Sequence, residues 1–317
     1  MEKTQLLSAA YIKAEAVRLG FSACGLSPAG AVNAAHTGFF RQWLARGCQA
    51  GMAYMENHEA LRLDPRKLME GCHTVVSLAM SYVPANPAPD DRLQLSWYVY
   101  GKDYHDVVRD KLHRLLSTLQ TAFPAAEGRV CCDTAPVLER YWAWQCGIGW
   151  IGHHTQLVIP YMGSAFFLGE ILLNLPADLY DAPMNKGCGN CTRCRDACPT
   201  HALTPEGLDA RRCLSYLTIE NRGEIPAEAA TKMFPYFYGC DRCLRACPHL
   251  RTATPTTEEA FAPSPGLQAM TDADWLHLDV EQYRRLFKGS AVKRAKYEGL
   301  ARNLAAIQTN ITTEKEI

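Results

Sequence analysis

Apolar residues recur with helical and strand-like periods in the first part of the 317-residue chain. Helical spacing predicts helices over residues 4–20, 31–46, 103–120 and 136–146. Short or continuous apolar runs predict strands at 21–26, 74–83, 129–132, 156–160 and 164–173, the last two paired around a turn at Met162 and Gly163. The run at 74–83 is apolar almost throughout, as in a strand buried on both faces. This alternation of strands and helices predicts an α/β domain over residues 1–178.

The pattern changes after residue 178. Long apolar runs are missing from the sequence between Asp181 and Leu250, where cysteine becomes dense. We therefore expect a second domain over residues 179–250 that is held by metal rather than by a hydrophobic core. A polar loop at 251–266 follows, and residues 272–308 have the spacing of two or three helices. Residues 251–317 are predicted to form a short helical C-terminal segment.

Composition excludes several classes of protein. Hydrophobic residues make up 48% and charged residues 21% of the chain, which is ordinary globular composition. Lys plus Arg and Asp plus Glu both number 33, so the net charge is zero and a uniformly basic nucleic-acid coat is excluded. No apolar run reaches the roughly 18 residues of a membrane span, and the N-terminus is amphipathic rather than signal-like. We expect a cytoplasmic protein with no membrane association.

Cysteine is the residue type that stands out. The chain has 14 cysteines, and eight of them lie between Cys188 and Cys247. In a reducing compartment, clustered cysteines indicate metal binding rather than disulfides. The first block is a Cys-x2-Cys-x2-Cys-x3-Cys-Pro run ending at Cys198 and Pro199, and the second is a Cys-x2-Cys-x3-Cys-Pro run starting at Cys240. The first block matches the bacterial ferredoxin run, in which the fourth cysteine binds the other of two clusters.

This spacing predicts two 4Fe–4S clusters. The second block is one cysteine short, and Cys213 can supply the missing ligand because it is the only other cysteine of the region. One predicted ligand set is Cys188, Cys191, Cys194 and Cys247, and the other is Cys198, Cys213, Cys240 and Cys243. A pair of zinc sites is the alternative, although this spacing is unusual for zinc. The remaining cysteines are interpreted as buried free thiols at positions 24, 48, 72, 131, 132 and 146.

A ferredoxin does not need the preceding α/β domain, so the clusters are expected to serve a reaction there. No phosphate-binding P-loop is present, and no Gly-x-Gly-x-x-Gly follows a strand. The glycines at 147–152 have the formal spacing but follow a helix and precede a strand, which is the wrong context for a dinucleotide site.

A family resemblance is carried by the segments 98–105, 133–140, 147–152, 163–170 and 287–294, together with the two cysteine blocks. Through these segments the sequence resembles the epoxyqueuosine reductase family over nearly its whole length. The resemblance implies an α+β protein with an N-terminal α/β cobalamin-binding domain, a ferredoxin-like domain with two 4Fe–4S clusters and a short helical C-terminus. The implied activity is reductive removal of the epoxide oxygen of epoxyqueuosine at the wobble position of a tRNA anticodon, giving queuosine. The implied cofactors are Co(I) cobalamin and the two clusters, with electrons from a low-potential donor such as flavodoxin or ferredoxin.

The resemblance also implies roles for single residues. Asp133 is expected to donate a proton, with a pKa raised by burial, whereas the alternative is a cap for the helix that follows it. The cobalamin contacts are expected to include Arg62, Asp133, His154, Thr155, Ser215 and Asp241. For Arg62 the alternative is a solvated surface side chain.

The chain departs from the family pattern at several positions. Family members often have Lys-Asn where this chain has His153 and His154, and Trp-Asn where it has His249 and Leu250. Some members also continue into a helical-repeat domain.

Basic residues gather near the C-terminus and predict a tRNA-binding patch at Arg285, Lys288, Lys293, Arg294 and Lys296. The alternative for this run is a solvated helix face. Three other functions remain open at this point: another corrinoid reductase resembling the reductive dehalogenases, a non-enzymatic electron carrier, and a tRNA-binding module with structural clusters.

Overall fold

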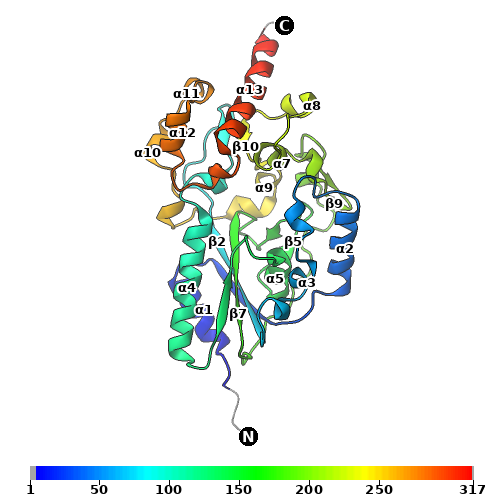
Figure 1. The fold of residues 1–317 in the computed structure, drawn as a ribbon, viewed down its shortest axis with the longest axis vertical. Helices are drawn as coiled ribbons and strands as arrows, with labels where there is room; N and C mark the ends of the chain where they lie inside the picture. The colour runs from blue at the N-terminus through cyan, green and yellow to red at the C-terminus, as the bar shows by residue number, and fades with distance from the viewer. Residues whose placement is uncertain (1–4, 316–317) are drawn as a thin grey trace.

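The computed structural model describes residues 5–315 and centres on a four-stranded sheet (Figure 1). Its strands are β1 (Ala23–Pro28), β2 (Thr74–Ser81), β4 (Gly128–Cys131) and β7 (Phe166–Leu173), in the order β1-β2-β7-β4. Each neighbouring pair is antiparallel. All eight residues of β2 are buried, which confirms the strand expected to be covered on both faces.

Helices cover both faces of this sheet. On one face, α1 (Ala9–Arg18) and α4 (Tyr104–Ala122) pack against β7, β1 and β4 through a stripe of leucines and valines on α4. On the other face, α5 (Glu139–Gln145) packs on β2 and β7, and α2 (Ala34–Ala45) adds Phe40 to the same core. The predicted mixture of strands and helices is confirmed, and the sheet is antiparallel.

Two sequence-based helix boundaries and one strand pairing were wrong. The first helix begins at Ala9, not at residue 4, because Ser8 caps it and Leu7 forms a bridge with Ala177 beside the sheet. The helix predicted at 136–146 begins at Glu139, after a turn that contains Pro136. The runs at 156–160 and 164–173 do not pair as two strands: β6 (Leu157–Val158) pairs with β5 (Trp150–Ile151), and β7 joins the main sheet.

The cysteine-rich segment consists of short elements, as its composition predicts. They are α6 (Arg193–Asp196), β8 (Leu203–Thr204), β9 (Gly207–Leu208), α7 (Leu214–Ile219), α8 (Ala227–Ala230), β10 (Tyr236–Tyr238) and α9 (Arg242–Arg245). The expectation that it lacks a core was wrong. Leu214, Phe237 and Leu244 are buried in a core shared with residues 93–100 and the C-terminal helices, and β10 pairs with β3 (Gln94–Leu95).

The C-terminal residues are helical, as expected. The helices are α10 (Pro265–Gln268), α11 (Asp272–Leu276), α12 (Val280–Leu286) and α13 (Lys296–Lys315). Asn303 on α13 is fully buried and donates hydrogen bonds to the carbonyls of Thr218 and Phe237, which ties α13 to the cysteine-rich segment. None of the helices within residues 5–315 has the length and apolar character needed to span a membrane.

The remaining helices are short. They are α3 (Glu59–Arg62) and the 3-10 helices η1 (Ala53–Met55), η2 (Pro65–Lys67), η3 (Trp97–Val99), η4 (Ala210–Arg212), η5 (Pro248–Thr252), η6 (Glu259–Phe261) and η7 (Ala291–Arg294).

Candidate functional site

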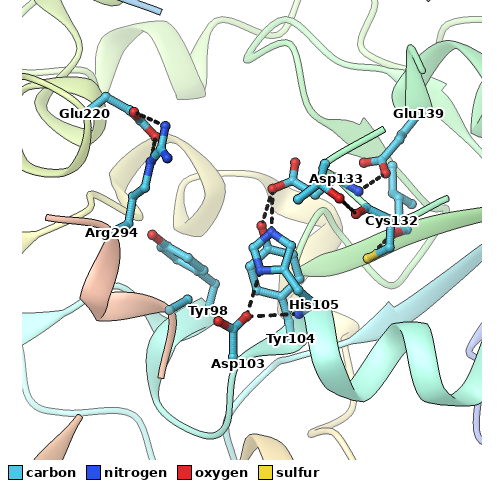
Figure 2. Close-up of polar contacts among 12 residues, drawn as sticks. Tyr98, Asp103, Tyr104, His105, Cys132, Asp133, Glu139, Glu220 and Arg294 are labelled. Carbon is cyan, nitrogen blue, oxygen red and sulfur yellow. Dashed lines mark hydrogen bonds and ion pairs between the residues drawn. The ribbon is translucent and has the colours of Figure 1, made fainter. Parts of the chain in front are cut away.

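The fold brings three distant sequence motifs to one place. The Asp103 backbone N–H donates to the Gly289 carbonyl at 2.7 Å, so the segments 98–105 and 287–294 lie side by side. Asp133 lies two residues after the end of β4 and faces the start of α4. Figure 2 shows Asp133 with Tyr104 and His105, and Arg294 with Glu220 across from them.

One carboxylate oxygen of Asp133 receives two hydrogen bonds. The Tyr104 hydroxyl donates to Oδ2 at 2.6 Å, and His105 Nε2 lies 2.9 Å from the same atom. The other imidazole nitrogen of His105, Nδ1, lies 2.7 Å from Asp103 Oδ1. Asp103 also caps α4 by accepting the His105 N–H at 3.1 Å. His105 is therefore held between two carboxylates in a fixed orientation.

The charges of this group hold a proton on the imidazole. Burial alone would lower the pKa of His105, but the hydrogen bonds and charges of Asp103 and Asp133 raise it to about 9. Burial would raise the pKa of Asp133, but the hydrogen bonds from His105 and Tyr104 and the charge of Arg140 hold it below its usual value. The expected rise in the Asp133 pKa was wrong, because its neighbours stabilise the carboxylate more than burial penalises it.

The capping alternative for Asp133 was also wrong. Leu138 precedes α5 in the N-cap position, and α5 has no side-chain cap. Instead, Asp133 adopts a left-handed backbone conformation with φ of 55°, and its N–H donates to Glu139 Oε1 at 2.5 Å.

Two carboxyl groups that sequence reasoning did not select, the half-buried Glu139 and the buried Glu170, lie near Asp133. Burial and the nearby charge of Asp133 raise the pKa of Glu139 to about 8. Glu170 on β7 is fully buried and accepts a hydrogen bond from the Ser77 hydroxyl, and burial raises its pKa well above the ordinary value. A single acid within the apolar run at 164–173 was the signal that could have identified Glu170.

The cysteines fall into the two sets that the spacing predicts. Cys188, Cys191, Cys194 and Cys247 line one cavity of about 50 Å³. In the second set, burial raises the pKa of the Cys243 thiol, and the charges of Cys240, Cys213 and Cys198 raise it further. Among the described residues no three His, Cys, Asp or Glu side chains are placed to share a single ion. The first four thiols instead surround a space, as the ligands of a cluster do.

The two cysteine sets have different surroundings. The first set follows the exposed residues 182–187, and the Trp150 indole N–H donates to Cys188 Sγ at 3.3 Å. The second set lies on the side of Tyr82 and Tyr98, since the charge of Cys243 acts on Tyr82 and the charge of Asp241 beside it acts on Tyr98. The Tyr98 ring lies 6.2 Å from that of Tyr104. The second set therefore lies toward Asp133, and the first set lies toward solvent.

Two of the predicted cobalamin contacts have buried polar atoms without a protein partner. Arg62 is only 8% exposed, so the surface alternative was wrong. Its Nη2 donates to the Tyr54 carbonyl at 3.0 Å, but its Nε has no partner among the described residues. Thr155 has a left-handed φ of 63°, and its buried hydroxyl also has none there. Such atoms fit a polar ligand, as the amide groups of a corrin would provide.

Of the other residues predicted to contact cobalamin, His154 and Asp241 are held by hydrogen bonds within the protein. The pKa of His154 is lowered to about 4 by burial and by the charges of Arg140 and His153, so its ring is neutral. His154 Nδ1 accepts the Gln156 N–H at 3.1 Å, and its Nε2 lies 3.2 Å from the Ser164 hydroxyl. Asp241 accepts the Trp97 N–H at 2.8 Å, and burial raises its pKa to about 6. Ser215 is half-buried on α7, two residues after Cys213.

The predicted basic patch spans several elements rather than one helix face. Arg285, Lys288, Lys293 and Lys296 are exposed between the end of α12 and the start of α13. Arg294 differs from them: both ends of its guanidinium bind the Glu220 carboxylate, at 2.9 and 2.8 Å, and the group lies 5.8 Å from the Tyr54 ring. The charge of Asp133 acts on Arg294, so Arg294 borders the candidate site.

Two family models match the chain. The model described as Epoxyqueuosine reductase QueG, DUF1730 matches residues 62–134, and the model described as 4Fe-4S double cluster binding domain matches residues 187–249. The epoxyqueuosine reductase of Leadbetterella byssophila is 43% identical over 297 residues, which cover 94% of this chain and 97% of that protein. The Escherichia coli epoxyqueuosine reductase is 37% identical over 282 residues, 87% of this chain and 74% of that protein.

Solved structures are similar over the same length. An epoxyqueuosine reductase with a tRNA-Tyr epoxyqueuosine-modified stem loop has a TM-score of 0.86 and 26% identity, covering 95% of this chain and 80% of that one. The Bacillus subtilis epoxyqueuosine reductase, described with its aspartate catalytic loop swung out of the active site, has a TM-score of 0.87 and 25% identity, covering 96% and 82%.

The fold and the cysteine sets define a redox enzyme with a double 4Fe–4S cluster domain. The chain belongs to the epoxyqueuosine reductase family.

Proposed function

We propose that this chain removes the epoxide oxygen of epoxyqueuosine at the wobble position of a tRNA anticodon, with Asp133 passing a proton to that oxygen. The observation that carries this proposal is the hydrogen-bonded group of Tyr104, His105 and Asp133, on the side toward which the second cysteine set lies. The relative solved with an epoxyqueuosine-modified stem loop supports the substrate. The relative described with an aspartate catalytic loop swung out of the active site supports the role of Asp133.

The reaction defines what the site must supply. Removing the epoxide oxygen breaks two C–O bonds and leaves an alkene and water, so it consumes two electrons and two protons. His105 carries a proton at neutral pH because its pKa is about 9. Both of the hydrogen bonds described for the Asp133 carboxylate end on Oδ2. A proton that leaves His105 Nε2 can therefore bind at Oδ2, and the same oxygen can then pass it to the epoxide oxygen.

The cysteine sets suit the supply of electrons. Clusters held by these eight thiols would provide one-electron transfer at low potential. The first set lies beside the exposed residues 182–187, where a low-potential donor such as flavodoxin or ferredoxin can approach. The Trp150 N–H bond to Cys188 Sγ places a donor on a ligand sulfur, an arrangement that tunes cluster potential.

The residues also fit a cobalamin. When bound in its Co(I) state, cobalamin supplies a strong nucleophile and electron donor. Arg62 Nε and the Thr155 hydroxyl would hold its polar side groups, with Ser215 and Asp241 on the side of the second cysteine set. His154 is neutral and occupied at both ring nitrogens, so its role is to fix the Thr155 turn rather than to bind cobalt.

Replacing Asp133 tests the proposal. Asp133→Asn preserves the shape of the side chain and removes its ability to carry a proton between His105 and substrate. We expect turnover of an epoxyqueuosine stem loop to fall by about 10² to 10⁴, the range for a lost general acid. The control is Asp110→Asn, an exposed carboxylate on the same helix as His105. Unchanged turnover by an Asp133→Asn protein that retains its clusters and cobalamin would remove Asp133 from the reaction.

A further inference from the structure

The backbone at Asp133 is held in an uncommon conformation. Its φ of 55° lies in the left-handed region, which non-glycine residues rarely adopt and which costs free energy unless the surroundings enforce it. The next residue closes a tight turn, because the Thr134 N–H donates to the Cys132 carbonyl at 2.6 Å. The side chain of Asp133 is about half exposed, so burial of that side chain does not enforce the conformation.

The Asp133 backbone N–H has a hydrogen-bond partner in the side chain of Glu139. Its Oε1 accepts the Asp133 backbone N–H at 2.5 Å (Figure 2). Glu139 is the first residue of α5, and this helix is anchored on the sheet by Tyr141 and Trp142, which are 5% and 2% exposed. The carboxyl group is therefore attached to a rigid element, whereas the loop at 132–138 is not part of a helix or strand.

We propose that Glu139 is a positioning residue, whose side-chain oxygen holds the Asp133 backbone in its left-handed conformation and thereby keeps the Asp133 carboxylate against His105 and Tyr104. This inference rests on the proposed function, in which Asp133 passes the proton. It assigns to Glu139 no contact with substrate or cofactor. The role requires a hydrogen-bond acceptor at this position, and it does not require a charge.

The protonation of Glu139 agrees with a neutral acceptor. The titratable and charged groups that interact with it are Asp133, Glu170, Arg140, His105, Tyr104, Cys131 and Cys132. Burial and the Asp133 charge raise its pKa to about 8, so the acid is mostly protonated at neutral pH. A protonated carboxyl still accepts through its carbonyl oxygen, and glutamine has nearly the same shape with an acceptor in the same place.

A second role for Glu139 makes a different prediction. If Glu139 itself passed a proton toward Asp133, glutamine would block the reaction as completely as an apolar residue would. If Glu139 positions the backbone, glutamine restores the function that leucine or alanine removes. Comparing these variants therefore distinguishes an acceptor from an acid.

The experiment compares Glu139→Gln, Glu139→Leu and Glu139→Ala in the protein loaded with clusters and cobalamin. Turnover of the epoxyqueuosine stem loop is measured, together with hydrogen exchange of the peptide that contains residues 132–138. We expect Glu139→Gln to stay within about threefold of wild type, and the apolar variants to lose about tenfold or more, because an N–H without its acceptor no longer holds the turn. Exchange at 132–138 should rise in the apolar variants alone.

Two results would overturn the inference. One is unchanged exchange at 132–138 in Glu139→Leu and Glu139→Ala; the other is an equal loss of turnover in Glu139→Gln and the apolar variants. Visible spectra confirm that clusters and cobalamin are retained in the variants compared. The exchange measurement does not depend on the identity of the proton donor, so it distinguishes failure of this inference from failure of the role of Asp133.

Discussion

Replacing Asp103 by asparagine tests whether the proton on His105 is needed for turnover. Asparagine is as good an N-cap as aspartate, so α4 keeps its first-turn hydrogen bond to the His105 N–H. The substitution removes one of the two carboxylates beside the imidazole, at 2.7 Å, and leaves Asp133 at 2.9 Å. Its effect should therefore be electrostatic rather than structural.

The size of the effect follows from the pKa of His105. That pKa is about 9 against an ordinary value of 6.5, a difference of about 2.5 that the two carboxylates produce against burial. Since the two contacts are of similar length, losing one should lower the pKa by at least half of this, to below about 8. At pH 8 the protonated fraction of His105 should fall from about nine-tenths to about a third or less.

The assay is the pH dependence of kcat on the epoxyqueuosine stem loop. A raised pKa means that His105 holds its proton below about pH 9 and loses it above that value, so wild-type kcat should fall on the alkaline side near pH 9. In Asp103→Asn this fall should move down by at least about one pH unit. The control Asp110→Asn, whose carboxylate is 70% exposed on the same helix, should leave the profile unchanged. An alkaline limb that stays in place in Asp103→Asn would refute the relay through His105.

Three further predictions follow from the same structure. In Cys213→Ala, the iron bound after reconstitution should fall from about eight to about four atoms per chain. The control Cys72→Ala, which replaces a buried thiol outside both ligand sets, should keep its iron. Full iron content in Cys213→Ala would contradict the second ligand set. In Glu220→Gln, the released Arg294 guanidinium should tighten tRNA binding and steepen its dependence on salt by about one phosphate contact, whereas unchanged binding would exclude Arg294 from the interface. Burial keeps Glu170 protonated in the folded state, so stability is lost as pH rises above its unfolded pKa of about 4.5. Glu170→Gln avoids this loss and should unfold at higher denaturant than wild type at pH 8 but not at pH 5, and equal midpoints at pH 8 would show that Glu170 is ionised.

The parts of the fold that the sequence predicted depend on local spacing. Cys188, Cys191 and Cys194 follow one another at short spacing, and the structure places them with Cys247 around one cavity. The two complete ligand sets stay a prediction. The spacing of the leucines in α4 and the continuous apolar run of β2 likewise predict which of their residues are buried. The division at residues 178 and 250 stays a prediction, and the core formed by Leu214, Phe237 and the C-terminal helices crosses the second boundary.

The features of the fold that the sequence did not predict depend on residues far away in the chain. Nothing near Leu7 indicates its bridge to Ala177, and nothing near 156–160 indicates that β6 pairs with β5 rather than β7. The predicted rise in the Asp133 pKa was wrong for the same reason, because that pKa depends on hydrogen bonds from His105 and Tyr104, which belong to another element. Glu139 was within a motif used for recognition, but its contact with the Asp133 N–H requires the left-handed turn, which spacing does not reveal.

The central claim is that electrons from two clusters and a proton through Asp133 meet at a cobalamin site to reduce epoxyqueuosine in tRNA. The most direct measurement is a single-turnover reaction of the anaerobically reconstituted protein with an epoxyqueuosine stem loop and a low-potential reductant, read by nucleoside mass spectrometry. The account predicts loss of one oxygen atom to give queuosine, only when iron–sulfur clusters and cobalamin are both loaded. Conversion without cobalamin, or no conversion by the fully loaded protein, would contradict it.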